Sequence, residues 1–290
     1  MFSMANLYRF FSVSDYTIDS VDKQYLYFSD LKDFNDPFEE LFIAKTNIPE
    51  PESITDGRLI SIHQKIRSYN PTAKVYTNEE FADMLLKGVS LTPFKNQLLK
   101  LTFSSLEEQY ELLVTNKKHC CFIQNSSNPV EKALESKLMW SHYADGLRGF
   151  VIEFDRSQLL ENLQSASDNH ISSGDMYYGD LASISVLETF EKFLDEGREA
   201  PYLSKVLKAK SSEWSYENEF RISSLKQKVN FEIACVRSVT FGAKMPPTQL
   251  QSLVHLLKKN GVPKDKLKYA TINRATYNID IIPLSDVHQN

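Results

Sequence analysis

The chain has 290 residues, of which 42% are hydrophobic and 12% aromatic, enough apolar material to fill a substantial core. It carries 33 basic and 38 acidic residues and a net charge of −5, whereas a protein that holds duplex DNA through its phosphates normally has a basic surplus. These values exclude an intrinsically disordered chain and leave a local basic patch as the only route to tight nucleic-acid binding.

Cysteine usage and apolar runs indicate where the protein works. Cys120, Cys121 and Cys235 are too few and too unevenly placed for a disulfide framework, so we expect reduced thiols and a cytoplasmic protein. No run approaches the roughly 18 apolar residues of a membrane span. Residues 1–6 lack the basic and apolar regions of a signal peptide, so we expect neither secretion nor membrane association.

The N-terminal part begins with two short strands, followed by a helical region. Aromatic residues predict strands at 7–11 and 25–29, with a short helix or a loop at 14–21. Residues 34–39, Phe-Asn-Asp-Pro-Phe-Glu, have the composition of a turn, because Pro fixes φ and Asn or Asp can bond its own backbone. From 54 to 113 apolar residues recur at helical spacing, which predicts several helices.

The remainder of the chain mixes short strands and helices. Apolar, β-branched or aromatic runs predict strands at 119–123, 149–154, 176–178, 214–222, 236–241, 267–271 and 277–282. Helical spacing predicts helices at 134–144, 184–194, 202–210 and 247–260. Gly146 follows the first of these helices, where a left-handed cap residue is expected.

Strands and helices do not alternate strictly, so a doubly wound parallel sheet is not expected. We predict an α+β fold with a mixed, mainly antiparallel sheet and a helical insertion at about residues 50–115. No linker or internal repeat divides the sequence, so we expect a single domain over residues 1–290.

Residues 214–222, Trp-Ser-Tyr-Glu-Asn-Glu-Phe-Arg-Ile, concentrate charge within one predicted strand. Alternation along a strand puts Glu217, Glu219 and Arg221 on one face. The opposite face then carries apolar side chains (Tyr216, Phe220 and Ile222). Two carboxylates and a guanidinium form a candidate catalytic floor if they line a cleft. Alternatively, each carboxylate forms an ordinary ion pair with Arg221 or with a lysine of a neighbouring strand.

Two further places carry candidate site residues. His142 and Tyr143 lie near a helix C-terminus. Either they line a pocket, with His142 as an acid or base, or Tyr143 packs while His142 interacts with the last carbonyls of the helix, where the dipole favours a cation. Arg9 lies between aromatic residues and is either an edge residue in a surface ion pair or a guanidinium that binds phosphate or ribose.

Common cofactor and metal motifs are absent. No glycine-rich phosphate loop, nucleophile elbow, Cys-x-x-Cys or His-Glu-x-x-His occurs. His119, Cys120 and Cys121 are neighbours whose side chains alternate along a strand, so we expect no metal site.

Several sequence blocks resemble a large bacterial family described only as a domain of unknown function. The most specific are Trp-Ser-His-Tyr-Ala at 140–144 and Asn-Asp-Pro-Phe at 35–38, and other blocks extend from residue 7 to residue 242. The resemblance implies a bacterial, intracellular protein and supplies no activity.

A second, weaker resemblance, to the ADP-ribosyltransferase fold, supplies an activity. A strand with Arg, a strand with Tyr-Phe-Ser and a late strand with Glu-x-Glu follow one another in a similar order. The resemblance implies that Arg9 orients NAD and that Tyr27 or Ser29 supports the nicotinamide ribose. It also implies that Glu219 drives the transfer, with Glu217 as the first Glu of the pair.

The chemistry is consistent with these roles. Cleavage of the nicotinamide glycosidic bond develops positive charge on the ribose, which a nearby carboxylate stabilises. We therefore expect an NAD-consuming enzyme, an ADP-ribosyltransferase or an NAD glycohydrolase, that acts as a bacterial toxin or phage-defence effector. His142 would join the catalytic residues, and Tyr143 and Arg221 the residues that bind NAD. We expect no metal ion. The sequence leaves open which macromolecule, protein or nucleic acid, accepts ADP-ribose and whether a partner protein regulates the enzyme.

Two other function classes are alternatives. Carboxylates could bind Mg²⁺ in a nuclease, with Asp36, Glu39, Glu217 and Glu219 as the ligands. The chain could also be a non-catalytic ligand sensor or interaction module, in which Glu217 and Glu219 serve stability alone.

Overall fold

The computed structural model describes residues 6–39, 41, 46–125, 132–168, 170–179, 184–197 and 207–288. The chain forms two compact units. The sheet unit comprises Met1–Asp30, Lys117–Met176 and Glu213–Asn290. The helical unit comprises Leu31–Asn116 and Tyr177–Ser212. The single domain expected over residues 1–290 stays a prediction.

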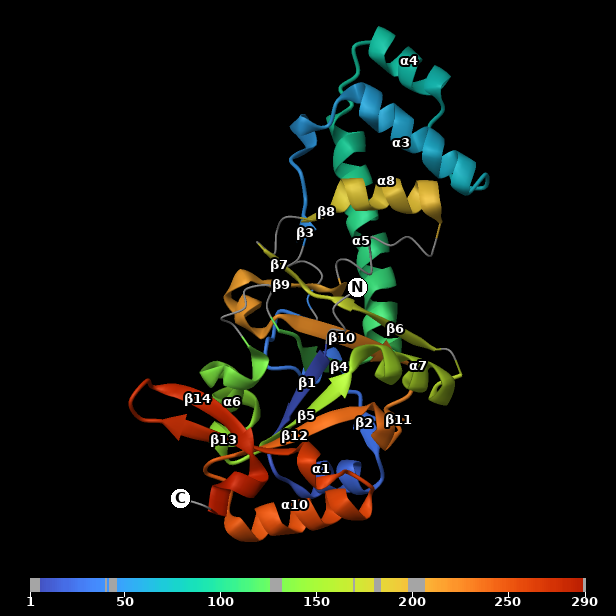
Figure 1. The fold of residues 1–290 in the computed structure, drawn as a ribbon. Coiled ribbons are helices and arrows are strands. Elements are labelled where there is room, and N and C mark those ends of the chain that lie inside the picture. The colour runs from blue at the N-terminus through green and yellow to red at the C-terminus, as the bar shows by residue number, and fades with distance from the viewer. Residues whose placement is uncertain are drawn as a thin grey trace, which may run out of the picture. The chain divides into compact units, whose positions relative to one another are not determined.

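The sheet unit is built on an eight-stranded sheet with the order β14-β13-β12-β5-β1-β4-β10-β6 (Figure 1). Neighbouring strands are antiparallel except β12 and β13, which run parallel. The strands are β1 (Asn6–Phe11), β4 (Lys118–Ile123), β5 (Phe150–Asp155), β6 (Ile171–Asp175), β10 (Glu219–Ser224), β12 (Val236–Gly242), β13 (Leu267–Asn273) and β14 (Asn278–Pro283). This mixed, mainly antiparallel sheet confirms the predicted α+β class.

Helices and a small antiparallel sheet complete the sheet unit. The helices are α1 (Asp15–Asp22), α6 (Lys137–Tyr143), α7 (Arg156–Ala166) and α10 (Pro247–Lys259). The small sheet pairs β2 (Tyr25–Tyr27) with β11 (Lys228–Asn230). Short 3-10 helices are η3 (Ala133–Glu135), η4 (Asp145–Leu147), η7 (Ile233–Cys235), η8 (Lys264–Lys266) and η9 (Leu284–His288).

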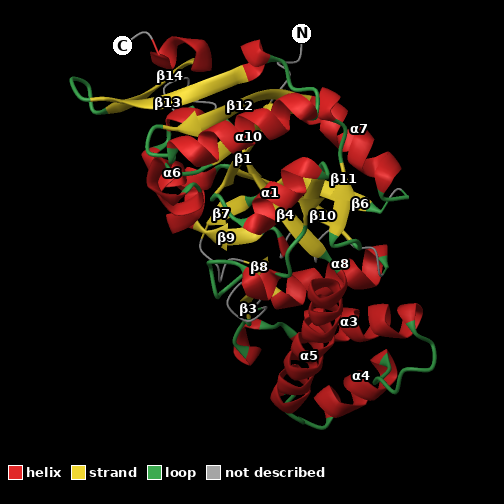
Figure 2. Ribbon diagram, turned by 90° about the horizontal axis from the view of Figure 1, so that it is seen from below, coloured by secondary structure: helices red, strands yellow, loops and turns green. Residues whose placement is uncertain are grey.

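Strand alternation gives the large sheet two distinct faces. The α10 face, represented by Leu7, Phe122 and Phe220, shares one apolar core with α1, α7 and α10. Figure 2 shows these three helices over the sheet. The α6 face, represented by Tyr8 and Ile123, shares a second core with α6. The two faces therefore provide separate environments for polar side chains.

The strands predicted at 7–11, 119–123, 149–154, 236–241, 267–271 and 277–282 are confirmed to within two residues at each end. The sequence pattern did not predict α7, β6 and β11. The side chain of Asp155 caps α7 by accepting from the Gln158 amide (3.0 Å), so the helix starts where β5 ends. β6 has the polar sequence Ile-Ser-Ser-Gly-Asp and owes its strand conformation to pairing with β10.

The strand predicted at 214–222 is wrong in its first half. Residues Ser212–Glu217 form a 3-10 helix, η6, and β10 begins only at Glu219. Asn218 between them has a φ of 40°, a left-handed conformation that interrupts the extended chain and that Asn tolerates better than most residues. Glu217 therefore lies outside the strand, and only Glu219 and Arg221 share a face by alternation.

The helical unit contains α3 (Asp56–Tyr69), α4 (Asn78–Leu86), α5 (Thr92–Asn116) and α8 (Val186–Glu196). The helical insertion predicted at about 50–115 is confirmed by the first three. Two parallel strand pairs belong to this unit, β3 (Thr46–Asn47) with β8 (Ile184–Ser185) and β7 (Tyr177–Gly179) with β9 (Ala209–Ser211). Its 3-10 helices are η1 (Leu31–Asp33) and η2 (Pro51–Ser53).

The helix predicted at 202–210 is wrong at its end, because Ala209–Ser211 form β9 and pair with β7. Residues 202–206 lie outside the described residues. Across the part of the chain that the structure describes, no helix is both long and apolar enough to span a membrane.

Two glycines hold the end of α6 against the sheet. The Gly149 amide donates to the Ala144 carbonyl (2.9 Å), and the Gly242 amide donates to the Gly149 carbonyl (3.0 Å). A Cβ on Gly149 would lie 2.9 Å from Ala144 Cα, and one on Gly242 would lie 2.8 Å from Leu147 Cα. Both distances are too short for real carbon atoms, so the absence of a side chain permits this close approach.

We expect Gly149→Ala and Gly242→Ala each to lower the free energy of unfolding by about 1–3 kcal/mol, because the added methyl group must displace backbone. Gly57→Ala is the control, since a Cβ there would meet no atom within 4 Å. Urea-induced unfolding followed by circular dichroism measures the difference. Equal stability of all three variants would contradict the close approach.

Candidate functional site

The structure does not bring Arg9 together with Glu219. Tyr8 of β1 and Glu219 of β10 are both register partners of Ile123 on β4, so their side chains share the α6 face. Arg9 is one residue further along β1 and projects from the α10 face. Its guanidinium lies 5.4 Å from the ring centroid of Phe11, on that same face.

Arg9 has its own surroundings on the α10 face. It donates to Cys120 Sγ and to the Tyr27 carbonyl (3.2 Å). Burial lowers the pKa of Arg9 to about 10, so the group stays charged at neutral pH. The Tyr27 side chain is exposed and its hydroxyl accepts from Gln227 Nε2 (2.6 Å). The predicted partners Arg9 and Tyr27 are therefore neighbours, away from the late carboxylates.

Ser29, the other predicted ribose contact, is tied to the sheet through its backbone. Its amide donates to the His119 carbonyl (2.8 Å), and its carbonyl accepts from the His119 amide (2.7 Å). These two bonds form an isolated antiparallel bridge between Ser29 and His119 of β4.

The α6 face carries the charged residues around β10. Glu219 and Arg221 are almost fully buried and form an ion pair, with Arg221 Nε 2.6 Å from Glu219 Oε1. Glu217, supplied by η6, is also buried and accepts a hydrogen bond from the Tyr143 hydroxyl of α6. We call Tyr143, Glu217, Glu219 and Arg221 the carboxylate cluster.

Four rings form a row next to this cluster. The ring centroids of Trp214 and Tyr216 are 6.1 Å apart, and those of Tyr216 and His142 are 6.3 Å apart. The His142 and Tyr143 rings follow at 6.4 Å. His142 is exposed and the other three are partly buried. This aromatic row (Trp214, Tyr216, His142 and Tyr143) offers ring surface on which a planar group can stack.

The burial of the carboxylate cluster has a chemical consequence. Moving a charge out of water costs several kcal/mol unless partners compensate, and Arg221 supplies such a partner for Glu219. A carboxylate held in a site of low dielectric acts strongly on charge that develops nearby. Glu217, anchored by a tyrosine hydroxyl beside the aromatic row, can accept a proton or stabilise a cation.

A second buried carboxylate network on the α6 face was not predicted from the sequence. Glu153 Oε1 accepts from Asn6 Nδ2 (2.8 Å) and from the Tyr8 hydroxyl (3.1 Å). Its Oε2 accepts from Ser238 and lies 3.4 Å from Lys268 Nζ. The sequence does contain a signal for this network, because Glu153 interrupts the apolar run 150–154. A charged residue in a buried strand is seldom buried without partners, so such partners could have been expected.

The network shifts the pKa of two of its members. Burial, with the nearby charge of Glu153, raises the pKa of Tyr8 to about 12, so the phenol remains a donor. Burial by itself would raise the pKa of Glu153, but the hydrogen bond from Ser238 and the charge of Lys268 outweigh it and lower that pKa.

Asp36 and Glu39, considered as metal ligands, have structural partners in the helical unit. Asp36 Oδ1 accepts from the Phe38 amide (2.9 Å), as expected for the predicted turn. Glu39 is buried and forms an ion pair with Lys210 (3.1 Å). Among the described residues, no group of three or more His, Cys, Asp or Glu side chains is placed to hold a metal ion.

The carboxylate cluster and the aromatic row lie within one continuous segment of the chain. Residues 139–222 match the family model described as Protein of unknown function (DUF2971). The match covers less than a third of the chain and confirms, for that segment, the expected similarity to a family of unknown function. No curated protein and no solved structure matches the chain significantly.

The hydroxyl of Tyr143 can be removed with little change in shape. Tyr143→Phe deprives buried Glu217 of a hydrogen bond, which typically costs about 1–3 kcal/mol. We therefore expect a lower free energy of unfolding in urea. Tyr277→Phe is the matched control, because Tyr277 is 79% exposed and should lose almost nothing. Equal loss in both variants would contradict the contact with Glu217.

The lowered pKa of Glu153 links stability to pH. The carboxylate stabilises the fold above its ordinary pKa of 4.5, and this contribution is lost as the pH falls through the lower folded-state value. Glu153→Gln cannot titrate, so its melting temperature should fall less than that of the wild type between about pH 6 and pH 3. Scanning calorimetry across this range measures both slopes, with the exposed Glu213→Gln as control. Parallel curves for Glu153→Gln and wild type would refute the link.

Proposed function

We propose that the protein consumes NAD by cleaving the nicotinamide glycosidic bond, as an ADP-ribosyltransferase or as an NAD glycohydrolase. One observation carries the proposal: a buried carboxylate, Glu217, accepts a hydrogen bond from Tyr143, a member of the partly exposed aromatic row. A planar leaving group and a developing cation need these two features together.

The aromatic row supports binding of the nicotinamide ring. Stacking on Tyr216 and His142 places the ring of the substrate next to Tyr143, whose hydroxyl bonds Glu217. As the bond to nicotinamide breaks, the ribose gains positive charge. The negative charge of Glu217 then lowers the energy of that state, because burial keeps water from screening it.

The roles of the other predicted residues change accordingly. Glu219 and Arg221 neutralise one another, so the carboxylate that acts on the ribose in this proposal is Glu217. His142, exposed at the end of α6, keeps its expected place among the catalytic residues. Arg9, Tyr27 and Ser29 have no part in this version of the site, because the register places Arg9 on the opposite face.

The wider biological role belongs to the same proposal. An enzyme that depletes NAD or modifies a macromolecule with ADP-ribose is suited to act as a toxin or a phage-defence effector in the cytoplasm. A partner protein that restrains it would then be needed by the host cell.

A non-catalytic ligand-binding module is the second candidate function. The observation in its favour is the nearly complete burial of Glu219 and Arg221 as an ion pair, since such a pair often serves architecture alone. In that case a nucleotide would bind at the aromatic row without being cleaved.

Incubation with NAD and chromatography of the released nicotinamide separates the two candidates. For the enzyme we expect release by the wild type and a loss of about 10²–10³-fold in Glu217→Gln, the effect typical of removing one electrostatic contribution to a transition state. Glu213→Gln, an exposed neighbour on η6, should retain full activity.

The controls decide what a negative result means. Circular dichroism must show that Glu217→Gln is folded. Arg9→Lys should leave nicotinamide release unchanged, since Arg9 lies on the α10 face. Absence of release by the wild type, or equal release by wild type and Glu217→Gln, would overturn the proposed chemistry. NAD binding without release would favour the module.

A further inference from the structure

The hydrogen bond between Tyr143 and Glu217 joins the ends of two helical segments, each of which is followed by left-handed backbone. Glu217 ends η6, and Asn218 directly after it has a φ of 40°. Tyr143 ends α6, and Asp145 and Leu147 shortly after it have φ values of 48° and 73°. Residues other than glycine disfavour this region, so each of these conformations costs free energy.

Left-handed residues are concentrated beside the carboxylate cluster. In the part of the chain that the structure describes, six residues other than glycine have a positive φ, and three of them follow Tyr143 or Glu217 within four positions. A residue persists in such a conformation only where its surroundings hold it, and residues of this kind gather at functional sites. The clustering therefore indicates that neighbouring structure constrains the backbone that carries these two side chains.

The end of β4 holds Asn218 in its left-handed conformation. The Gln124 amide donates to the Asn218 carbonyl (3.1 Å), and Asn218 Nδ2 donates back to the Gln124 carbonyl (3.1 Å). On its other side, the Asn218 amide donates to the Ser215 carbonyl of η6 (3.2 Å). Both the backbone and the side chain of Asn218 are therefore engaged, and a replacement at this position loses the side-chain bond to Gln124.

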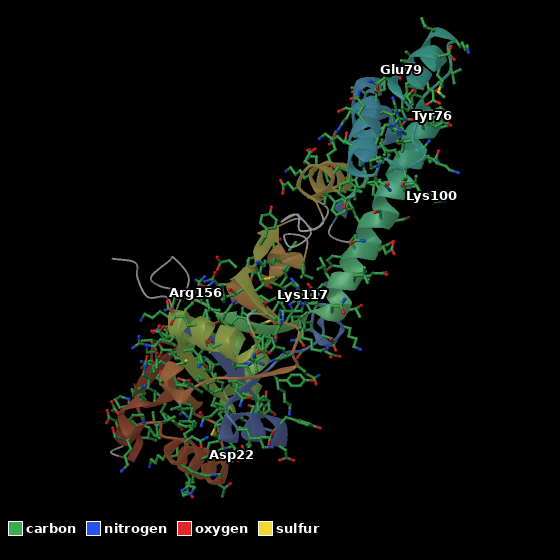
Figure 3. All side chains as sticks on the ribbon, turned by 90° about the vertical axis from the view of Figure 1, so that its right-hand side faces the viewer. Asp22, Tyr76, Glu79, Lys100, Lys117 and Arg156 are labelled. Carbon is green, nitrogen blue, oxygen red and sulfur yellow. The ribbon has the colours of Figure 1, made fainter. Side chains whose placement is uncertain are left out.

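Gln124 is itself anchored to two further elements of the sheet unit. Its Nε2 donates to Asp175 Oδ1 at the end of β6 (2.7 Å), and its Oε1 accepts from Arg156 Nη1 at the start of α7 (3.1 Å). Figure 3 labels Arg156. Because both ends of its side-chain amide are held, Gln124 offers Asn218 a fixed pair of backbone partners.

We propose that Asn218 is a positioning residue, whose left-handed conformation, held by Gln124, orients the Glu217 carboxylate toward the Tyr143 hydroxyl. A residue that relaxes to a negative φ rotates the peptide between positions 217 and 218, and this rotation moves Glu217 away from Tyr143. Asn adopts the left-handed region more readily than most other residues, which suits it to this place. The orientation of Glu217 is independent of any reaction, whereas its consequence for catalysis rests on the function proposed above.

A double-mutant cycle tests this orientation without any substrate. The loss of stability caused by Tyr143→Phe is measured by urea-induced unfolding in the wild type, in Asn218→Val and in Asn218→Gly. Valine is strongly disfavoured at a φ of 40°, so we expect Asn218→Val to have separated Glu217 from Tyr143 already, and Tyr143→Phe to cost much less there than in the wild type. Glycine keeps the left-handed backbone, so the full cost should return in Asn218→Gly.

Nicotinamide release measures the consequence for the proposed reaction. Displacement of a catalytic group by about 1 Å can cost about 10²-fold in rate, so we expect a fall of this size in the kcat of Asn218→Val, larger than any rise in its KM. Asn218→Gly should recover kcat to within about tenfold of the wild type, because it lacks one neutral hydrogen bond. Gln24→Val is the matched control. Gln24 has a φ of 53°, and its carbonyl accepts from Phe231 in the core of the α10 face, so this variant should lose stability and keep its kcat.

The two experiments separate this inference from the proposed function. An equal cost of Tyr143→Phe in all three backgrounds, or a reduced cost that glycine does not restore, would overturn the positioning role of Asn218. A reduced cost in Asn218→Val that returns in Asn218→Gly supports the role even if the wild type releases no nicotinamide, a result that would overturn the proposed function alone. Asn218→Ala, which also disfavours a positive φ, replaces Asn218→Val in the cycle if that variant does not fold.

Discussion

The register between β1, β4 and β10 is the constraint on which the placement of charge in this protein depends. Ile123 faces Tyr8 on one side and Glu219 on the other, which assigns every second residue of three strands to the α6 face. A shift of one residue would exchange the polar row of β10 for Phe220 and Ile222 and expose the apolar core. Burial of that core therefore fixes where the carboxylates point.

The charged side chains buried on the α6 face lose their hydration on folding, which costs free energy. Glu217, Glu219, Arg221 and Glu153 are all nearly inaccessible to water, and each needs partners to offset the loss of hydration. Well-packed apolar residues in place of a buried ion pair are often neutral or stabilising. The gain in stability from the Glu219–Arg221 pair by itself is therefore small.

Local elements of this fold could be predicted well, because their determinants are local. Aromatic and β-branched runs identified six strands of the large sheet, and helical periodicity identified α3, α4, α5 and α10. The polar strand β6 could not be found this way, since it is a strand only because β10 pairs with it. Asn218 changed the site most, because a single left-handed residue moved Glu217 out of the predicted row.

The sequence by itself determined the residue types of the site, the alternation along each strand and the α+β class. Only the tertiary structure decided which faces coincide, because pairing joins residues more than a hundred positions apart, as between Tyr8 and Ile123. It separated Arg9 from Glu219 and joined Tyr143 to Glu217. Strand periodicity determines only that successive side chains lie on opposite faces of a sheet. The register between strands far apart in sequence determines which side chains become neighbours on each face.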